Sequence, residues 1–285
     1  MCLSGVLPCY QGFLKKLQHE KPLVHALHAE MVGLVRDVLS KFMKPEAIPL
    51  QVSDLLRLDI GDRNLQLPDK GLFVGRYSFS AMTKARVEKQ IWIRKIYSDL
   101  REGYIKSATF FLKNLPLKNK VISAMSVLTP SLMSHASAQE AFITLAKALP
   151  NIVESEELGQ LDEEVRAYQI DKDPRDKAKT FDEDSQRIDE DWWSGVFEIK
   201  SQGKLKFPIM GKLVRALITV FTGPLIEGSF NLMDDIVEQD RTRMNIETYE
   251  ALAIIKSHMK AIGKSAANMD IDPALRRSCL SSYVR

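Results

Sequence analysis

The residue whose surroundings most suggest chemistry is Glu227, a carboxylate just inside the apolar segment GPLIEGSFNLMDDIV, residues 223–237. Asn231, Asp234 and Glu238 follow it at helical spacing, so the four polar side chains form one stripe. Carboxylates that converge on a divalent metal ion let the ion activate an attacking oxygen and stabilise a leaving one. A stripe of this kind is equally typical of a solvated helix face, so both interpretations stay open.

Histidine and cysteine, two other common metal ligands, give weaker patterns. His25 and His28 stand three residues apart, a spacing that metal sites use, but no third ligand follows at a motif spacing. A structural role is therefore favoured for this pair. Cys2, Cys9 and Cys279 form neither a CxxC pair nor an even disulfide set, which indicates reduced thiols and excludes a zinc finger.

Positive charge gathers on the outer face of a helix predicted over residues 81–115. A basic face can hold a phosphate backbone by releasing counterions, although a solvated face is the more ordinary interpretation. The predicted nucleic-acid face consists of Lys84, Arg86, Lys89, Arg94, Lys95 and Arg101. The net charge of +3 hides an uneven distribution, because residues 154–191 carry fifteen Asp and Glu against six Lys and Arg.

The elements that must position these groups are predicted to be mainly α-helical, because apolar residues recur at helical spacing. Between the helices, the strand-like residues 55–61 and 71–75 predict a small hairpin. This first helical region covers residues 1–150. Its helices are predicted over residues 21–43, 81–115 and 137–148.

Two further regions follow from a change in composition. Residues 151–191 are predicted to form an acidic linker, since large apolar residues nearly vanish over their second half. Trp192 and Trp193 then begin a final module over residues 192–263, and residues 264–285 form a tail. Helices of the module are predicted over residues 206–221, 224–240 and 246–262.

The helices of this final module show more apolar circumference than one packing neighbour can cover. In a monomer part of that area would stay exposed as a patch, which soluble proteins rarely tolerate. We therefore expect self-association through the module. The residues expected in its core or its dimer contact are Trp192, Trp193, Phe207, Pro208, Phe230, Tyr249, Leu252, Ile255 and Met259.

Five features of the module, in a fixed order, carry a resemblance to a known family. They are the tryptophan pair, FPIMGKLVRALITV, GPLIEGSFNLMDDIV, the Arg241/Arg243 pair and NIETYEALAIIK. From Trp192 to Lys256 the chain resembles the C-terminal dimerisation region of hAT-family transposases. In that family a segment of the form ERxFS follows a helix introduced by a YP or FP pair, and EGSFN stands in its place here.

Residue by residue, Glu227 matches the family Glu, Phe230 the family Phe and Arg243 the later Arg. Gly228 and Asn231 depart from the motif, which puts the original activity in doubt. The resemblance implies an RNase H-like fold in which two Asp and the late Glu hold divalent metal ions. Those two Asp would precede the helical insertion region that the first region of this chain resembles, and the chain begins after that place.

The resemblance therefore favours a non-catalytic protein or fragment of a domesticated transposon, in which Glu227 is vestigial and no cofactor is bound. Its expected partners are a second copy of the chain or a related hAT-like protein, and DNA or chromatin. One alternative is an α-helical adaptor without a nucleic-acid role, whose acidic belt docks a basic partner. Another is part of a metal-dependent transposase that an upstream segment or a partner completes.

Membrane insertion is not expected from the sequence. No window approaches the length of uninterrupted apolar residues that a membrane span needs, and the opening residues lack the basic start of a signal peptide. We expect a nuclear or cytoplasmic protein, and the resemblance favours the nucleus.

Overall fold

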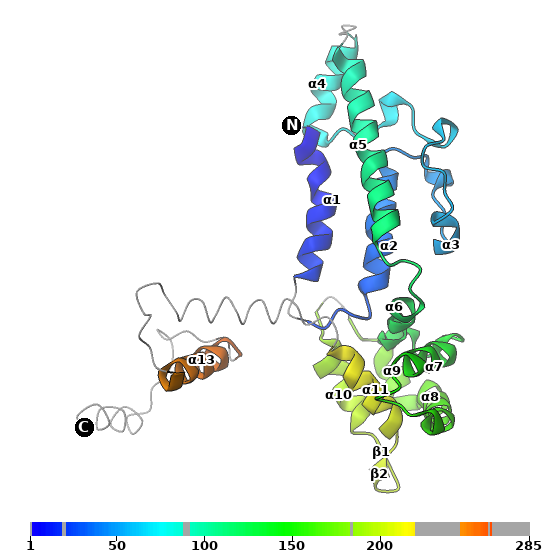
Figure 1. The fold of residues 1–285 in the computed structure, drawn as a ribbon, viewed down its shortest axis with the longest axis vertical. Coiled ribbons are helices and arrows are strands. Elements are labelled where there is room, and N and C mark those ends of the chain that lie inside the picture. Colours follow the sequence, from blue (N-terminus) through cyan, green and yellow to red (C-terminus); the bar gives the residue numbers. More distant parts are fainter. Residues whose placement is uncertain are drawn as a thin grey trace, which may run out of the picture. The chain divides into compact units, whose positions relative to one another are not determined.

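The computed structural model describes residues 2–18, 21–87, 92–182, 185–219, 246–261 and 263 (Figure 1). The chain divides into two compact units, residues 1–221 and 222–285. Nearly all of the described regular structure is helical, which confirms the predicted mainly α class. Among the described residues, no helix combines the length and apolar character needed to cross a membrane.

The first unit contains two hydrophobic cores, and the first of these lies around α2 (Leu27–Ser40) and α5 (Trp92–Asn114), which pack together (Figure 1). α1 (Cys2–Leu17) packs against α2 and against α4 (Arg76–Val87). Phe42, just beyond the end of α2, stacks on Tyr104 of α5 with ring centroids 6.0 Å apart, and both rings are buried. Aromatic stacking therefore fixes how the end of α2 meets α5.

The single helix predicted over residues 81–115 is wrong, because the structure has two helices there, α4 and α5, which pack against each other. α5 itself continues without a break through Gly103. α2 begins later than predicted. The N–H groups of Ala26 and Leu27 both donate to Leu23 O at 3.0 Å, which closes a turn ahead of the helix.

The hairpin predicted from residues 55–61 and 71–75 is also wrong, since α3 (Val52–Leu55) and short 3-10 turns occupy this stretch. Within the stretch the backbone forms only local turns, and its longer-range backbone bonds go to the chain just beyond α2. The Leu67 N–H donates to Phe42 O at 2.8 Å, so tertiary contacts replaced the local pairing that the sequence suggested. The 3-10 turns span Pro45–Ala47, Arg63–Leu65 and Asp69–Gly71.

The second core joins the elements from α6 to α11 around buried aromatic and aliphatic side chains. Its helices are α6 (Lys120–Ala124), α7 (Ala138–Ala148), α8 (Leu158–Ile170), α9 (Lys172–Ala178), α10 (Ser194–Phe197) and α11 (Pro208–Ile218). Three 3-10 turns and one π-helical turn connect them, spanning Met125–Leu128, Pro130–Leu132, Ser155–Glu157 and Ile188–Trp193 respectively. α7 packs against α6 and α8, and α8 packs against α11.

The acidic linker predicted over residues 151–191 is wrong, and so is the domain boundary at its end. Leu161, Val165 and Tyr168 lie on one face of α8 and are buried in the second core. The residues on both sides of the predicted boundary share this core. A narrow apolar stripe is enough to bury one face of a helix, even where charged residues dominate the composition.

A short antiparallel hairpin connects α10 to α11. It consists of β1 (Lys200–Ser201) and β2 (Lys204–Leu205), joined by Gln202 and Gly203. These two residues have φ angles of 52° and 81°, the left-handed conformation that a two-residue hairpin turn requires. The hairpin therefore reverses the chain directly ahead of α11.

In the second unit the structure describes α13 (Ile246–Ala261) and Gly263. This confirms the helix predicted over residues 246–262, as α11 confirms the helix predicted over residues 206–221. The helix predicted over residues 224–240 and the tail over residues 264–285 lie outside the described residues.

Candidate functional site

An aromatic centre lies in the second core of the first unit, formed by Tyr168, Trp192, Trp193 and Phe207. Tyr168 stacks on Trp193 at 5.6 Å between ring centroids and meets Phe207 edge-on at 5.9 Å. The Trp192 Nε1–H donates to the Tyr168 hydroxyl at 3.2 Å, and the Trp193 Nε1–H donates to Leu128 O at 3.1 Å. All four rings are buried, and burial raises the pKa of the Tyr168 hydroxyl above its usual value. The centre is therefore a satisfied, uncharged core.

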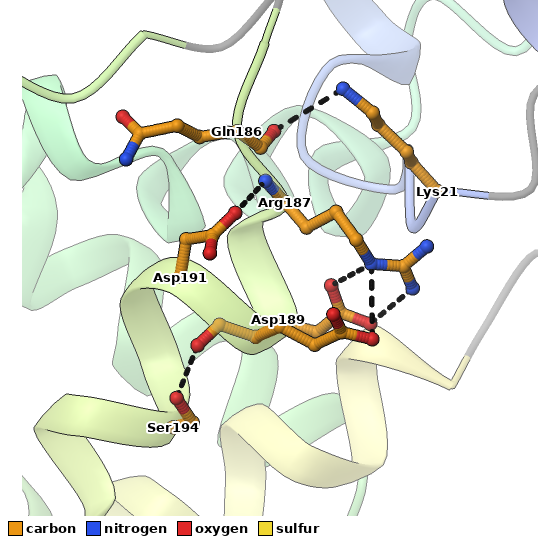
Figure 2. Close-up of polar contacts among 7 residues, drawn as sticks. Lys21, Gln186, Arg187, Asp189, Asp191 and Ser194 are labelled. Carbon is orange, nitrogen blue, oxygen red and sulfur yellow. Dashed lines mark hydrogen bonds and ion pairs between the residues drawn. The ribbon is translucent and has the colours of Figure 1, made fainter. Parts of the chain in front are cut away.

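A π-helical turn presents both tryptophans to this core, and charged groups brace its outer side (Figure 2). The Arg187 guanidinium contacts Asp189 at 2.8 Å and Glu190 at 3.3 Å. The Arg187 backbone N–H donates to the Asp191 carboxylate at 2.6 Å. Lys21, from the segment ahead of α2, reaches Gln186 O at 3.5 Å. These contacts orient the turn, so its acidic residues have structural partners.

One functional group that the sequence did not single out is Glu164 on α8. Its carboxylate accepts the Met210 N–H at 2.8 Å and the Gln160 side-chain amide at 2.9 Å, and its residue is only 6% exposed. Phe207, at the N-cap of α11, provides no side-chain cap, so Glu164 satisfies a free N–H at this helix start from another helix. Burial raises the pKa of Glu164, although the hydrogen bonds oppose that shift.

The predicted core or dimer residues divide into two groups. Trp192, Trp193 and Phe207 are buried inside the first unit, which fits their expected place in the core and leaves these side chains out of any dimer contact. Pro208 is exposed and is not part of that core. It stands at the first position of α11, where the missing N–H of proline costs nothing. Phe230 lies outside the described residues.

The remaining group lies on α13. Tyr249, Leu252 and Met259 are half-buried there, and Ile255 is 51% exposed. Ile246 and Ile254 expose still more, 81% and 61%. A helix with this much accessible apolar surface can bury more of it against a further partner.

The predicted nucleic-acid face is smaller than expected because Arg101 does not belong to it. Arg101 is buried and donates to Leu67 O at 2.9 Å, to the Gln66 side chain at 3.1 Å and to Asp69 at 2.7 Å. The sequence did contain a signal, because Arg101 falls on the buried stripe of Tyr97, Tyr104 and Ala108.

The other members of that face are divided between two helices. Lys84 lies exposed on α4, and Arg94 and Lys95 lie exposed near the start of α5. The position of the Arg86 side chain and the whole of Lys89 lie outside what the structure describes. The exposed basic groups that can be placed are therefore Lys84, Arg94 and Lys95.

The histidine pair has the structural character that was favoured. His25 is buried, burial lowers its pKa to about 4, and within the described chain its Nδ1 has no hydrogen-bond partner. His28 donates from Nε2 to Leu117 O at 3.2 Å. His25 is therefore neutral near pH 7, and His28 connects α2 to the start of the α6 region.

The carboxylate that opened the question of metal chemistry, Glu227, lies outside the described residues, as does Arg243. Its proposed vestigial role stays a prediction. In the described ranges, no group of three or more His, Cys, Asp or Glu side chains is placed to hold a metal ion.

Comparison of the chain with protein-family models, with curated proteins and with solved structures found no match.

Proposed function

We propose that the chain is a non-catalytic protein derived from an hAT-like transposase, which acts by self-association and by contact with DNA or chromatin. The aromatic centre carries this proposal. It joins the tryptophan pair and the helix introduced by Phe207 and Pro208, two features on which the resemblance rests, to Tyr168 of DEEVRAY, residues 162–168. Side chains packed in this way have a structural role, which supports a module retained as a folded core and not as a catalytic site.

The distribution of charge supports contact with DNA through the first helical region. Residues 1–150 carry twenty-one Lys and Arg against twelve Asp and Glu. Residues 154–191 carry the opposite excess and would repel a phosphate backbone. A gel-shift experiment at two salt concentrations tests this contact, because affinity must fall as salt rises when counterions are released.

Self-association is assigned to the face of α13 that carries Leu252, Ile255 and Met259, of which Ile255 is 51% exposed. Light scattering on the full chain should give the mass of two chains, and Leu252→Asp/Ile255→Asp should reduce it to one. Ser257→Asp/His258→Asp, at exposed positions of the same helix, adds the same charges and should leave the dimer intact. A parent of single-chain mass at micromolar concentration would contradict the proposal, as would a folded Leu252→Asp/Ile255→Asp variant of unchanged mass.

An adaptor without a nucleic-acid role is the second candidate, favoured by exposed carboxylates on α8 and α9. Glu163, Asp173 and Asp176 are exposed there and could meet a basic partner. This candidate predicts no gel shift at either salt concentration. The third hypothesis is that the chain is part of a metal-dependent transposase, and a metal-dependent DNA-nicking assay on the full chain tests it.

A further inference from the structure

A groove with a volume of about 760 Å³ lies where the two cores of the first unit meet. Leu117 of the first core and Val127 and Ala138 of the second core line it together. His28 reaches it from α2, and Ser53 from α3. Volumes between about 300 and 1,000 Å³ are usual for small-molecule sites, so this groove has the size for a ligand of that class.

The groove is rich in hydrogen-bond donors and carries a positive charge. Lys118 and Lys120 line it, are exposed, and form no ion pair with any residue that the structure describes. His135 lies among the lining residues and accepts the Ser137 N–H at its Nδ1, at 3.3 Å. The neutral imidazole therefore carries its proton on Nε2, which is a donor.

Charge and shape together narrow the class of ligand. Glu140 is the one carboxylate among the described lining residues, so the two ammonium groups leave an excess of positive charge. Ammonium groups bind phosphate oxygens as point charges, and the Ser123 hydroxyl and the Asn119 side-chain amide add donors to the lining. Val52, Leu117 and Leu132 supply apolar lining for the body of the ligand. A phosphate ester has both of these parts.

We infer that this groove binds a phosphate ester of about nucleotide size, with Lys118 and Lys120 at the phosphate. The phosphate can belong to a free nucleotide or to the backbone of a nucleic-acid strand. The inference rests on the proposed function only for the second source, where it names the surface through which the strand is held.

Isothermal titration calorimetry on the full chain, with adenosine 5′-monophosphate and separately with a short single-stranded oligonucleotide, tests the inference. Lys118→Ala/Lys120→Ala should weaken binding of at least one probe about tenfold or more, the loss expected from charge-assisted hydrogen bonds. Lys113→Ala/Lys147→Ala removes the same charge at exposed positions that do not line the groove and should change affinity much less. Glu140→Gln should strengthen binding, because it removes the one carboxylate among the described lining residues.

Several outcomes would overturn the inference. They are binding of neither probe, equal weakening by the two lysine double variants, and weaker binding in Glu140→Gln. Circular dichroism on each variant shows that the fold persists. If Lys118→Ala/Lys120→Ala in the full chain still shifts DNA in a gel and still binds both probes with parental affinity, the groove is not the phosphate site. The proposed function then stands without it. A monomeric parent that binds either probe through the two lysines rejects self-association and supports the groove.

Discussion

Among the described residues, each of the two cores of the first unit buries one charged side chain, and they stabilise it in different ways. In the first core Arg101 pairs with Asp69, whose own side chain is 57% exposed, and it also donates to Leu67 O. In the second core Glu164 accepts the Met210 N–H and the Gln160 amide, and it forms no ion pair with the described residues. Arg101 therefore depends on an ion pair and a carbonyl acceptor, whereas Glu164 depends on amide N–H donors.

This difference shows what the buried charges do for the fold. Arg101 fastens the irregular stretch around residues 66–69 to α5, where a hairpin was expected. Glu164 fastens the start of α11 to α8, inside what was expected to be a linker. Each charge therefore joins two segments that lie far apart in the sequence, and the two should respond differently to mutation and to pH.

The largest expected effect comes from Trp193 in the second core. Trp193→Ala should lower the free energy of unfolding by about 3–5 kcal/mol, because it empties a fully buried site and leaves Leu128 O without its donor. Phe42→Ala in the first core should fall in the same range of about 3–5 kcal/mol, nearer its lower end, because its ring makes no such bond. Denaturant titration followed by circular dichroism measures both losses.

Trp92→Ala provides the control for this substitution, because Trp92 is 48% exposed. Its cost should stay within about 1 kcal/mol. A Trp193→Ala variant as stable as Trp92→Ala would show that the aromatic centre does not hold the second core.

The second largest effect is expected from the protonation of His25. This residue lies between Val24, which belongs to the second core, and Leu27, which packs against the first core. Its folded pKa of about 4 lies below the ordinary value of 6.5, so the unfolded chain binds the proton more readily between these two values. The contribution of neutral, buried His25 to the free energy of unfolding is fully present above about pH 6.5. It falls by about 3 kcal/mol as the pH drops to about 4.

Denaturant titrations across this pH range measure the loss, and His25→Phe should remove most of this slope. His258→Gln, at an exposed position on α13, should leave the slope unchanged. If His25→Phe keeps the parental slope, other groups govern the acid sensitivity and the junction of the cores is not the sensitive place.

Arg101 should come next. Arg101→Ala should cost about 2–3 kcal/mol, since Gln66 and Leu67 O lose a buried donor. Asp69→Asn should cost about 1 kcal/mol or less, because a partly exposed ion pair contributes little. Thermal and denaturant melts of the two variants compare them directly. Equal costs would mean that the ion pair, and not the buried hydrogen bonds, holds the irregular stretch.

The smallest effect is expected for Glu164→Gln, at about 1 kcal/mol near neutral pH, because an amide oxygen can still accept the Met210 N–H. Burial raises the folded pKa of Glu164, so the folded state binds a proton more readily than the unfolded state. This term therefore lowers stability as pH rises from the usual carboxyl range through the raised pKa.

The Gln variant should lose that slope, and the comparison is cleanest in a His25→Phe background, which removes the opposite slope of the histidine. Glu164→Ala should cost more than Glu164→Gln, by roughly 1 kcal/mol, because it leaves the start of α11 uncapped. An unchanged slope in Glu164→Gln would show that the carboxylate is not buried in solution.

Much of the helical content could be predicted from the sequence, and the reason is local. α7, α11 and α13 were predicted from apolar residues at helical spacing, which is a property of neighbouring residues. The end of the basic helix before Pro116 was predictable in the same way. The roles of Glu164 and Arg101 were not predicted, because Arg101 bonds to residues 32 to 35 positions away and Glu164 accepts the Met210 N–H from 46 positions away along the chain.

By itself, then, the sequence determined that this protein is mainly helical, that its charge is divided between a basic and an acidic region, and that His25 and His28 belong to the fold. Tertiary structure alone decided that the acidic stretch carries a core helix and that the tryptophan pair faces inward. The physical reason is that composition records the average exposure of a segment, whereas burial depends on which face meets a distant partner. On α8, three apolar residues on one face, Leu161, Val165 and Tyr168, bury the helix although charged residues surround them in the sequence.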